Sequence, residues 1–454
     1  MTQAAQDNAR KKALALYRGI EEDFLASLKA QGLVFAEEDR EKAESNRLMG
    51  MLEEAGARIR NGRASVVLGD LSRGCVACTG ACPSRTFAIT NNCHRDCYFC
   101  FNPNQRDFAY YCEHDFPWRR QLEELAGEPE AADSIALSGG EPLLNPKEVL
   151  AFFKRARELF PNAHLRMYTS GDLLSERLLE DLRGAGMDEI RFSIKLEDSD
   201  VLRERVLGFM ETATRLIPTV MVEMPVIPDT EEEMKALLLR FDKIGIFGVN
   251  LLEFTYPMWN WEAFDSRGFK LKNPPFEVVY DYTYAGSLAV AGSEELALSL
   301  MLWSHEKGLH PSLHYCSLEN KHRGQIRKAN EPFAHANPNY AFDYDDFFLK
   351  TVVAFGHDRP LIRQALARVG SRTFTNDDAS ESLSFHPRFA NSVLHCLREE
   401  GRDVQLYLSC NVVEKHGDEN VFRELSLRNF ESGHIQLSDL TSKSDRRAGC
   451  SLVL

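Results

Sequence analysis

The sequence predicts an α/β protein built around a partial or full (β/α) barrel, with a helical extension before it and a small α+β domain after it. Three observations predict this architecture. Between residues 86 and 256, six apolar segments of strand length alternate with segments of helical periodicity. The chain before them carries two long helical patterns, and after about residue 341 strands and helices follow in a different order. Regular alternation of strands and helices is typical of a parallel sheet, and its repetition indicates a barrel.

The N-terminal segment is predicted to form two amphipathic helices, at 8–31 and 38–61. In the first helix, apolar residues recur at roughly helical spacing and form a continuous stripe, made of Leu14, Leu16, Tyr17, Ile20, Phe24 and Leu28. We therefore expect residues 1–70 to form a helical extension that packs on the main domain.

The barrel domain is predicted to span residues 71–335. Its strands are expected at 86–90, 134–138, 164–169, 189–195, 219–227 and 249–256. Its helices are expected between them, at 117–127, 147–159, 174–185, 199–216 and 230–244. Because active sites of such folds lie at the carboxyl ends of the strands, polar residues at those ends are the first candidates for a site.

The last part of the chain follows a different pattern. Residues 258–340 are less regular, and Trp259, Trp261, Tyr256 and Phe254 are aromatic candidates for lining a substrate pocket at the end of the sixth strand. Beyond them we expect a strand, two helices and a strand, at 347–356, 358–369, 389–401 and 404–413. Residues 341–454 are therefore predicted to form a small α+β domain of unknown role.

Charge and cysteine content narrow the function. The formal net charge is -14, which argues against a nucleic-acid partner because an acidic surface repels phosphate backbones. No apolar run approaches the ~20 residues that span a bilayer, and the polar N-terminus does not resemble a signal peptide. We expect a cytoplasmic protein without a membrane partner. In that reducing compartment metal or catalytic roles are favoured over disulfides for its eleven cysteines.

The strongest motif is the spacing Cys93-x-x-x-Cys97-x-x-Cys100 directly after the first predicted strand. Three thiolates at this spacing can hold one [4Fe–4S] cubane and leave its fourth iron without a protein ligand. That iron is then open to the amino and carboxylate groups of a methionine moiety. The alternative is a zinc site, but zinc sites of this kind normally take four protein ligands in paired CxxC units.

The segment NNCHRDCYFC, with the aromatic Phe99 before its last cysteine, resembles the cluster motif of the radical S-adenosylmethionine (SAM) superfamily. The second strand ends in Ser-Gly-Gly-Glu-Pro-Leu, which is similar to the GGEP motif of the same family. The resemblance implies that the backbone approaches SAM at Gly139 and Gly140, and that Glu141 accepts a hydrogen bond from the SAM amine. It further implies SAM contacts at Ser170, Ser193 and Lys195, which end the third and fourth strands, and Glu223 on the fifth strand could face the same cavity.

Further segments resemble a poorly characterised radical SAM group related to pyruvate formate-lyase activating enzymes. They are the Gly-Cys-x-x-Cys at 74–78, the Asn-x-x-Glu-Phe at 250–254, the Ala-Gly-Ser-Glu-Glu at 291–295 and the His-Tyr-Cys-Ser at 314–317, with Lys321, Gln325 and Arg327. The resemblance covers roughly residues 70–330. It specifies SAM cleavage and does not specify a substrate.

A second set of cysteines lies outside the cluster motif. Cys75 and Cys78, with the distant Cys316, are candidate ligands of an auxiliary iron–sulfur cluster or a zinc ion, because soft ligands within reach of one another bind such metals. The alternative is that Cys75 and Cys78 are small buried residues without a ligand role. Cys316 could also serve catalysis as a redox or radical-relay thiol.

The predicted function is reductive cleavage of SAM at the cluster, which makes a carbon radical that modifies a small-molecule or peptide substrate. Such an enzyme needs an electron donor such as ferredoxin or flavodoxin. Two alternatives stay open. One is an activase that installs a radical on a partner protein, and the other, in a different class, is a non-enzymatic iron–sulfur electron carrier, which would have no need for the Gly-Gly-Glu-Pro segment.

Overall fold

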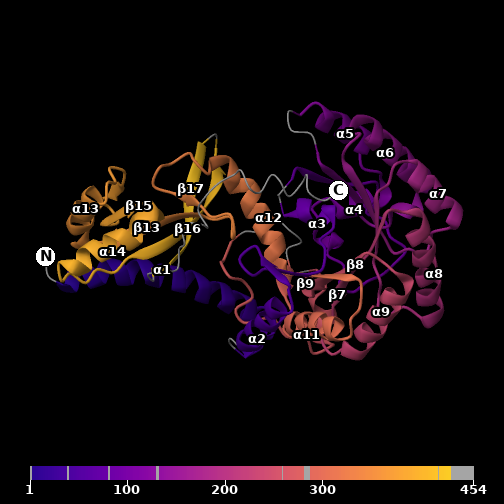
Figure 1. Ribbon diagram of the computed structural model, residues 1–454, viewed down its shortest axis with the longest axis horizontal. Coiled ribbons are helices and arrows are strands. Elements are labelled where there is room, and N and C mark those ends of the chain that lie inside the picture. Colours follow the sequence, from indigo (N-terminus) through magenta and orange to yellow (C-terminus); the bar gives the residue numbers. More distant parts are fainter. Residues whose placement is uncertain are drawn as a thin grey trace. The chain divides into compact units, whose positions relative to one another are not determined.

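The computed structural model describes residues 3–37, 40–79, 82–128, 132–257, 259–280, 287–417 and 419–430. The chain divides into two compact units, which Figure 1 shows with their elements labelled. In the described residues, the larger unit comprises 33–276 and 287–322, and the smaller unit comprises 3–32, 277–280 and 323–430. Each unit is described by itself below.

The larger unit contains a nine-stranded sheet in the order β1-β2-β11-β8-β7-β6-β5-β4-β3. From β3 to β8 every neighbouring pair is parallel, and β11 continues the parallel sheet beside β8. The strands are β1 (Arg58–Arg60), β2 (Ser65–Leu68), β3 (Ser84–Ala88), β4 (Ser134–Ser138), β5 (His164–Thr169), β6 (Glu189–Phe192), β7 (Thr219–Val226), β8 (Gly248–Glu253) and β11 (Ser312–Cys316). In the described residues β1 and β3 end the sheet without pairing with each other, so the predicted α/β barrel is confirmed in its partial form.

Helices cover one face of this sheet, and Figure 1 shows five of them, α5 to α9, in an arc along the outer side of the unit. The unit's helices are α2 (Arg40–Glu54), α3 (Arg73–Cys78), α4 (Phe108–Glu113), α5 (Trp118–Ala126), α6 (Pro146–Leu159), α7 (Glu176–Gly184), α8 (Asp200–Leu216), α9 (Glu231–Ile244), α10 (Trp261–Asp265) and α11 (Ser293–Glu306). Every second side chain of a strand points towards these helices. Leu165 and Met167 of β5 are examples, and both belong to the main hydrophobic core.

Three strands of the sheet come from segments that the sequence did not predict as strands. β11 lies in the stretch that was expected to be irregular, and β2 pairs antiparallel with it, with Cys316 opposite Ser65. The predicted second helix was expected to extend to residue 61, but α2 ends at Glu54, and Gly56 with φ 90° turns the chain into β1. The predicted sixth strand is divided into β8 and the short β9 (Thr255–Pro257), which pairs with β10 (Ser287–Ala289).

The face of the sheet opposite the helices is polar. Here α3 contacts β4 and β5, and its Gly74 lies directly against the guanidinium groups of Arg166 and Arg191. A Cβ at Gly74 would come within 2.8 Å of an Arg166 nitrogen and an Arg191 nitrogen. A residue without a side chain is therefore required where this short helix meets the two arginines.

The smaller unit is an α+β structure. Its sheet follows the path β14-β15-β13-β16-β17 with β12 paired to β13, and the residues are β12 (Ala341–Phe342), β13 (Leu349–Phe355), β14 (Thr375–Asp377), β15 (Ser382–Phe385), β16 (Tyr407–His416) and β17 (Glu419–Asn429). Its helices are α1 (Gln3–Ala30), α13 (Asp358–Arg368) and α14 (Ala390–Glu399), and α12 (Leu318–Asn330) supplies its later residues. The predicted order of strand, two helices and strand corresponds to β13, α13, α14 and β16. Residues 431–454 of the predicted domain lie outside the described residues.

The division into units differs from the boundaries predicted at residues 70 and 335. Helix α1 packs on β17 and β13 of the smaller unit, where the Tyr17 hydroxyl donates to the Glu424 carboxylate. Helix α2 packs on α11 of the larger unit. The apolar stripe of each helix was visible in the sequence, but the stripe does not specify which sheet buries it.

Candidate functional site

The three cysteines of the cluster motif lie in a loop after β3, at the carboxyl edge of the parallel sheet. The loop is not helical, and the Cys100 N–H donates to the Cys97 carbonyl at 2.9 Å. The pKa of the Cys97 thiol is raised to about 11, mainly by partial burial. The charge of Lys195 opposes this rise, whereas the nearby Cys100 and Cys93 contribute to it. Burial likewise raises the pKa of Cys93 and of Cys100, again with Lys195 opposing. The three thiols and the Lys195 ammonium therefore share one site.

The double-glycine turn after β4 lies against this loop. Gly140 N–H donates to the Thr90 carbonyl and Glu141 N–H donates to the Asn92 carbonyl, each at 2.9 Å. A Cβ on Gly140 would lie 2.0 Å from the Asn92 oxygen, and one on Gly139, whose φ is 114°, would lie 2.5 Å from the Thr90 oxygen. Two consecutive glycines are thus required for the turn to approach the cluster loop so closely.

The carboxylate of Glu141 organises the neighbouring turn after β5. It is 2% exposed, and its Oε1 accepts from Leu143 N–H at 3.1 Å and from the Thr169 hydroxyl at 2.8 Å. Its Oε2 accepts from the Ser170 N–H at 2.7 Å. The Ser170 hydroxyl lies 2.7 Å from Glu141 Oε2 and 2.5 Å from Asp172 Oδ1, so its single proton serves one of these two carboxylates. Four protein donor groups thus lie within hydrogen-bond distance of the Glu141 carboxylate. The contact of Glu141 with a SAM amine stays a prediction.

His94 and Arg95, both inside the cluster loop, attach it to acidic residues that follow neighbouring strands. His94 Nε2 lies 2.8 Å from the Asp172 carboxylate, which follows β5. Arg95 pairs with the same carboxylate at 3.5 Å and also with Asp198, which follows β6. Burial would raise the pKa of Asp172, but hydrogen bonds from Ser170 and His94 hold it below its usual value. The sequence analysis did not identify these four residues, although acids directly after two strands were a usable signal.

A second attachment comes from the segment after β9. The Trp259 indole donates to the Cys100 carbonyl at 2.5 Å, and the Asn260 amide donates to the Tyr98 carbonyl at 2.9 Å. Phe99 lies edge-on to Phe254 with ring centroids 6.1 Å apart. Of the aromatic residues expected to line a pocket, Phe254 and Tyr256 are buried in packing, whereas Trp259 is 42% exposed and holds the cluster loop.

The remaining predicted SAM contacts lie at the same edge. Ser170 is bonded to Glu141, Ser193 N–H donates to the Thr169 carbonyl at 2.9 Å, and Lys195 is close to the thiols as described above. Glu223 lies deeper, on the polar face of the sheet, where it pairs with Arg191 at 2.7 Å. Burial opposes its ionisation, but the Arg191 guanidinium keeps the pKa of Glu223 below its usual value.

The second set of cysteines lies on that polar face as well. The Cys75 sulfur is 3.3 Å from Arg191 Nη2 and 3.2 Å from Asn250 Nδ2, and the Cys316 sulfur is 3.2 Å from Asn320 Nδ2. Cys78 is exposed to solvent, and desolvation by the surrounding protein raises the pKa of its thiol. Burial raises the pKa of Cys316 to about 12, and both Cys78 and Cys75 contribute to the shift.

In the part of the chain that the structure describes, no three Cys, His, Asp or Glu side chains stand at metal-ligand spacing. To bind a metal, the cysteines of each set, Cys93, Cys97 and Cys100 or Cys75, Cys78 and Cys316, would therefore have to move closer together by rotation of their side chains. None of the helices in the described residues combines the length and apolar character that crossing a membrane requires.

Comparison with known proteins agrees with the geometry at the strand ends. Residues 87–241 match the model of the Radical SAM superfamily. A Methanocaldococcus jannaschii protein named as a glycyl-radical enzyme activating enzyme is 28% identical over 306 residues, which are 65% of this chain and 76% of the relative. The PqqA peptide cyclase of Gluconobacter oxydans is 30% identical over 129 residues, which are 28% of this chain and 34% of the cyclase.

Solved structures with a similar arrangement include two proteins of low sequence identity. Coproporphyrinogen III oxidase (HemN) from Escherichia coli is 12% identical, with 77% of this chain and 82% of that chain covered at a TM-score of 0.37. Streptococcus suis SuiB, bound to the precursor peptide SuiA, is 13% identical, with 47% of this chain and 44% of that chain covered at a TM-score of 0.34.

Proposed function

We propose that this chain, whose residues 87–241 match the model of the Radical SAM superfamily, is an enzyme that cleaves SAM reductively at a [4Fe–4S] cluster on Cys93, Cys97 and Cys100. One observation carries the proposal. The three-cysteine loop after β3 and the double-glycine turn after β4 are hydrogen-bonded to each other at the carboxyl edge of a parallel sheet.

The residues present fit both groups. Three thiols beside one ammonium are a donor set for a cubane with one open iron, and the two glycines let the turn after β4 pack directly against the backbone of the loop that carries these thiols. When bound, the cluster and SAM supply an electron and a carbon radical by cleavage of the sulfonium C–S bond. Gly139, Gly140 and Ser170 are the proposed SAM-binding residues, with Ser193 and Lys195 at the adjacent strand ends.

The residues around the loop serve to hold this geometry. His94 and Arg95 attach the loop to the ends of β5 and β6, and Trp259 and Asn260 attach it from the other side. A loop fixed at both ends keeps the thiols in place when an electron donor, for which we propose a ferredoxin or flavodoxin, delivers its electron. The open cubane and the free thiols favour the reducing cytoplasm as the site of action.

The test is anaerobic incubation of the reconstituted chain with SAM and dithionite, followed by chromatography for 5′-deoxyadenosine. Wild type should release it. Cys97→Ala should lose about four irons, the broad ~400 nm absorbance and the product. Cys396→Ala, which changes a thiol of the smaller unit without an assigned role, is the matched control and should keep all three. Full iron content and product in Cys97→Ala would overturn the assignment.

An auxiliary iron–sulfur cluster or zinc ion on Cys75, Cys78 and Cys316 is a further part of the proposal. Its support is that three thiols lie within electrostatic reach of one another on the polar face, next to the guanidinium of Arg191. Metal analysis of the triple alanine variant of the primary cluster cysteines tests it, since any iron or zinc that remains must lie elsewhere. A triple variant without metal would return Cys75 and Cys78 to a packing role.

For the substrate we propose a small molecule or a peptide.

A second candidate function is activation of a partner protein through a glycyl radical. This candidate is favoured by the name of the M. jannaschii relative and by the 76% of its length that the chain covers. Electron paramagnetic resonance of a source-cell lysate treated with the reduced enzyme and SAM separates the two. A glycyl-radical doublet that depends on SAM supports the activase, whereas its absence together with formation of 5′-deoxyadenosine favours the first candidate.

A further inference from the structure

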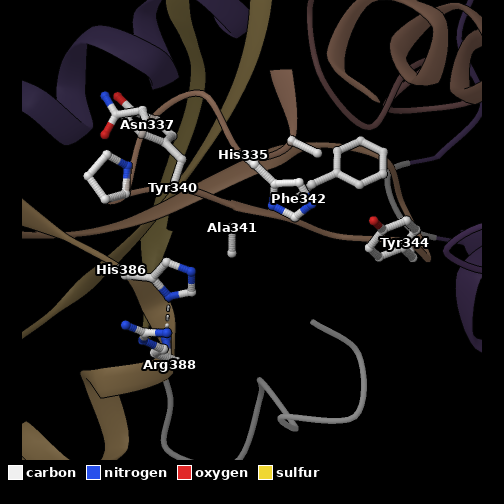
Figure 2. Close-up of a pocket in the computed structure, with 10 residues that line it drawn as sticks. His335, Asn337, Tyr340, Ala341, Phe342, Tyr344, His386 and Arg388 are labelled. Carbon is white, nitrogen blue, oxygen red and sulfur yellow. Dashed lines mark hydrogen bonds between the residues drawn. The ribbon is translucent and has the colours of Figure 1, made fainter. Parts of the chain in front are cut away.

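A pocket in the smaller unit has the chemistry of a ligand site that the SAM chemistry does not use. Its volume is about 250 Å³, and its polar lining residues are His335, Asn337, Tyr340, Tyr344, His386 and Arg388. Figure 2 shows His386 and Arg388 on one side and the segment that carries His335 and Tyr344 on the other. We call it the His386 pocket. It is formed by the segment 334–344, which consists mostly of turns and contains the two-residue strand β12, and by the turn after β15.

The orientation of His386 is fixed by its own backbone turn. Its Nδ1 accepts a hydrogen bond from the Arg388 N–H at 3.1 Å, which Figure 2 marks with a dashed line. An Nδ1 that accepts carries no proton, so the ring proton lies on Nε2 and the imidazole is a hydrogen-bond donor there. Burial, and then the positive charge of Arg388, lower the pKa of His386 to about 4. The ring is therefore neutral at physiological pH and keeps this single donor.

Arg388 provides a cation without a carboxylate partner among the described residues. Its guanidinium lies 4.5 Å from the centroid of the Phe389 ring and is exposed to solvent. Other arginines of the same unit are paired, for example Arg359 with Asp378 and Arg423 with Glu414, each at 2.9 Å. No Asp or Glu belongs to the lining of the pocket. Arg388 is therefore a cation at a pocket whose lining contains no carboxylate.

The opposite wall adds a donor and two aromatic rings. Asn337 Oδ1 accepts from the Asn339 N–H at 3.0 Å, so the Asn337 amide presents its NH2 group as a donor. The rings of Phe342 and Tyr344 pack edge to face with centroids 4.9 Å apart and belong to the wall. Asn337, His386 and Arg388 thus line a cavity that also has aromatic residues in its wall.

We propose that the His386 pocket binds a small anion, a carboxylate or a phosphate, attached to a flat apolar body. Arg388 and His386 would take the anionic group, since a guanidinium matches the planar oxygens of either group in two parallel hydrogen bonds. The flat body would lie along the wall of Phe342 and Tyr344. This inference goes beyond the proposed SAM chemistry and does not depend on it.

Calorimetric titration of the full chain with four probes tests the proposal. Phenyl phosphate and benzoate carry the charge and the ring, inorganic phosphate carries only the charge, and benzamide carries only the ring. We expect phenyl phosphate or benzoate to bind at least about tenfold more tightly than benzamide, as the loss of a charge-assisted hydrogen bond predicts. The stronger of the two identifies phosphate or carboxylate as the natural group.

Three variants complete the experiment. Arg388→Met keeps an unbranched apolar stem and removes the guanidinium charge, and it should weaken binding by about tenfold or more. His386→Phe keeps the ring, removes the donor and should weaken binding less. Arg372→Met, at an exposed arginine of the same unit outside the pocket, is the control and should bind as wild type does. Equal binding by Arg388→Met and wild type, equal binding of benzamide, or no binding of any probe at millimolar concentration would overturn the inference. None of these readouts uses SAM cleavage, so the two proposals fail separately.

Discussion

Replacement of Glu141 by glutamine tests whether this residue binds the SAM amine or accepts hydrogen bonds within the protein. The family resemblance assigns Glu141 to the SAM amine, whereas in the structure four protein donor groups lie within hydrogen-bond distance of its carboxylate, one of them the Ser170 hydroxyl that it shares with Asp172. Glutamine has the same shape but only one acceptor oxygen. Its NH2 group must therefore face either the Ser170 N–H and hydroxyl or the Leu143 N–H and the Thr169 hydroxyl.

The cost of this change follows from the contacts. The hydroxyl in either pair can rotate and accept from the new NH2 group, but the backbone N–H cannot. One buried N–H therefore loses its acceptor in both orientations, which costs about 1–3 kcal/mol, and the remaining bonds lose the assistance of the negative charge. We expect Glu141→Gln to lower the stability of the larger unit by about 2–4 kcal/mol, which corresponds to a decrease in apparent Tm of about 5–10 °C.

Scanning calorimetry of the chain without SAM measures the effect, because no SAM contact contributes under that condition. Glu158→Gln is the matched control, since Glu158 is exposed and pairs only with Arg155 at the surface. Its Tm should change by no more than about 1–2 °C. If Glu141→Gln melts with the wild type but binds SAM more weakly, the internal hydrogen bonds are not formed in solution. The reasoning from the structure is then refuted, and the direct SAM contact is the correct role.

Three further predictions concern the loop, the turn and the smaller unit. Trp259→Phe removes one hydrogen bond to the cluster loop, so the reconstituted cluster should lose iron faster on desalting than in the control Trp261→Phe. Gly140→Ala places a Cβ at 2.0 Å from a carbonyl oxygen and should abolish SAM binding in equilibrium dialysis, whereas Gly208→Ala, with nothing within 4 Å, should not weaken it. Burial and a nearby acid raise the pKa of Asp346 to about 6, so its folded form holds a proton that the unfolded form releases between about pH 4 and 6. Wild type should therefore lose stability relative to Asp346→Asn as the pH rises through this window, by at most about 3 kcal/mol, and a pH-independent Tm difference would contradict this.

The sequence predicted the repeated part of the fold because each strand and helix there has its own local signal. The predicted segments 134–138 and 164–169 coincide with β4 and β5, whose buried apolar residues alternate with polar ones or form short apolar runs. β11 was missed because it is only five residues long, Ser-Leu-His-Tyr-Cys, and its short alternation lies within a stretch that is otherwise irregular. Its pairing with β8 and β2 is a property of the tertiary structure. The attachment of α1 to the smaller unit also depends on contacts between residues about 400 positions apart, such as Tyr17 with Glu424.

The site shows the same division between local and long-range information. Cys93, Cys97 and Cys100 could be found because one loop contains all three, and the glycine turn because it directly follows a strand. The residues that fix the loop could not be found by spacing, since Arg95 meets acids 77 and 103 positions away and Trp259 meets Cys100 from 159 positions away. From the sequence alone, these charged residues and hydrogen-bond donors look like ordinary surface residues. Only the folded sheet brings them together, because it places the carboxyl ends of its strands at one edge. The cysteine motif thus supplies the ligands of the proposed cluster. The residues at the other strand ends determine how rigidly the loop that carries these ligands is fixed. This is the physical reason to expect that Trp259→Phe changes the retention of the cluster without removing any of its ligands.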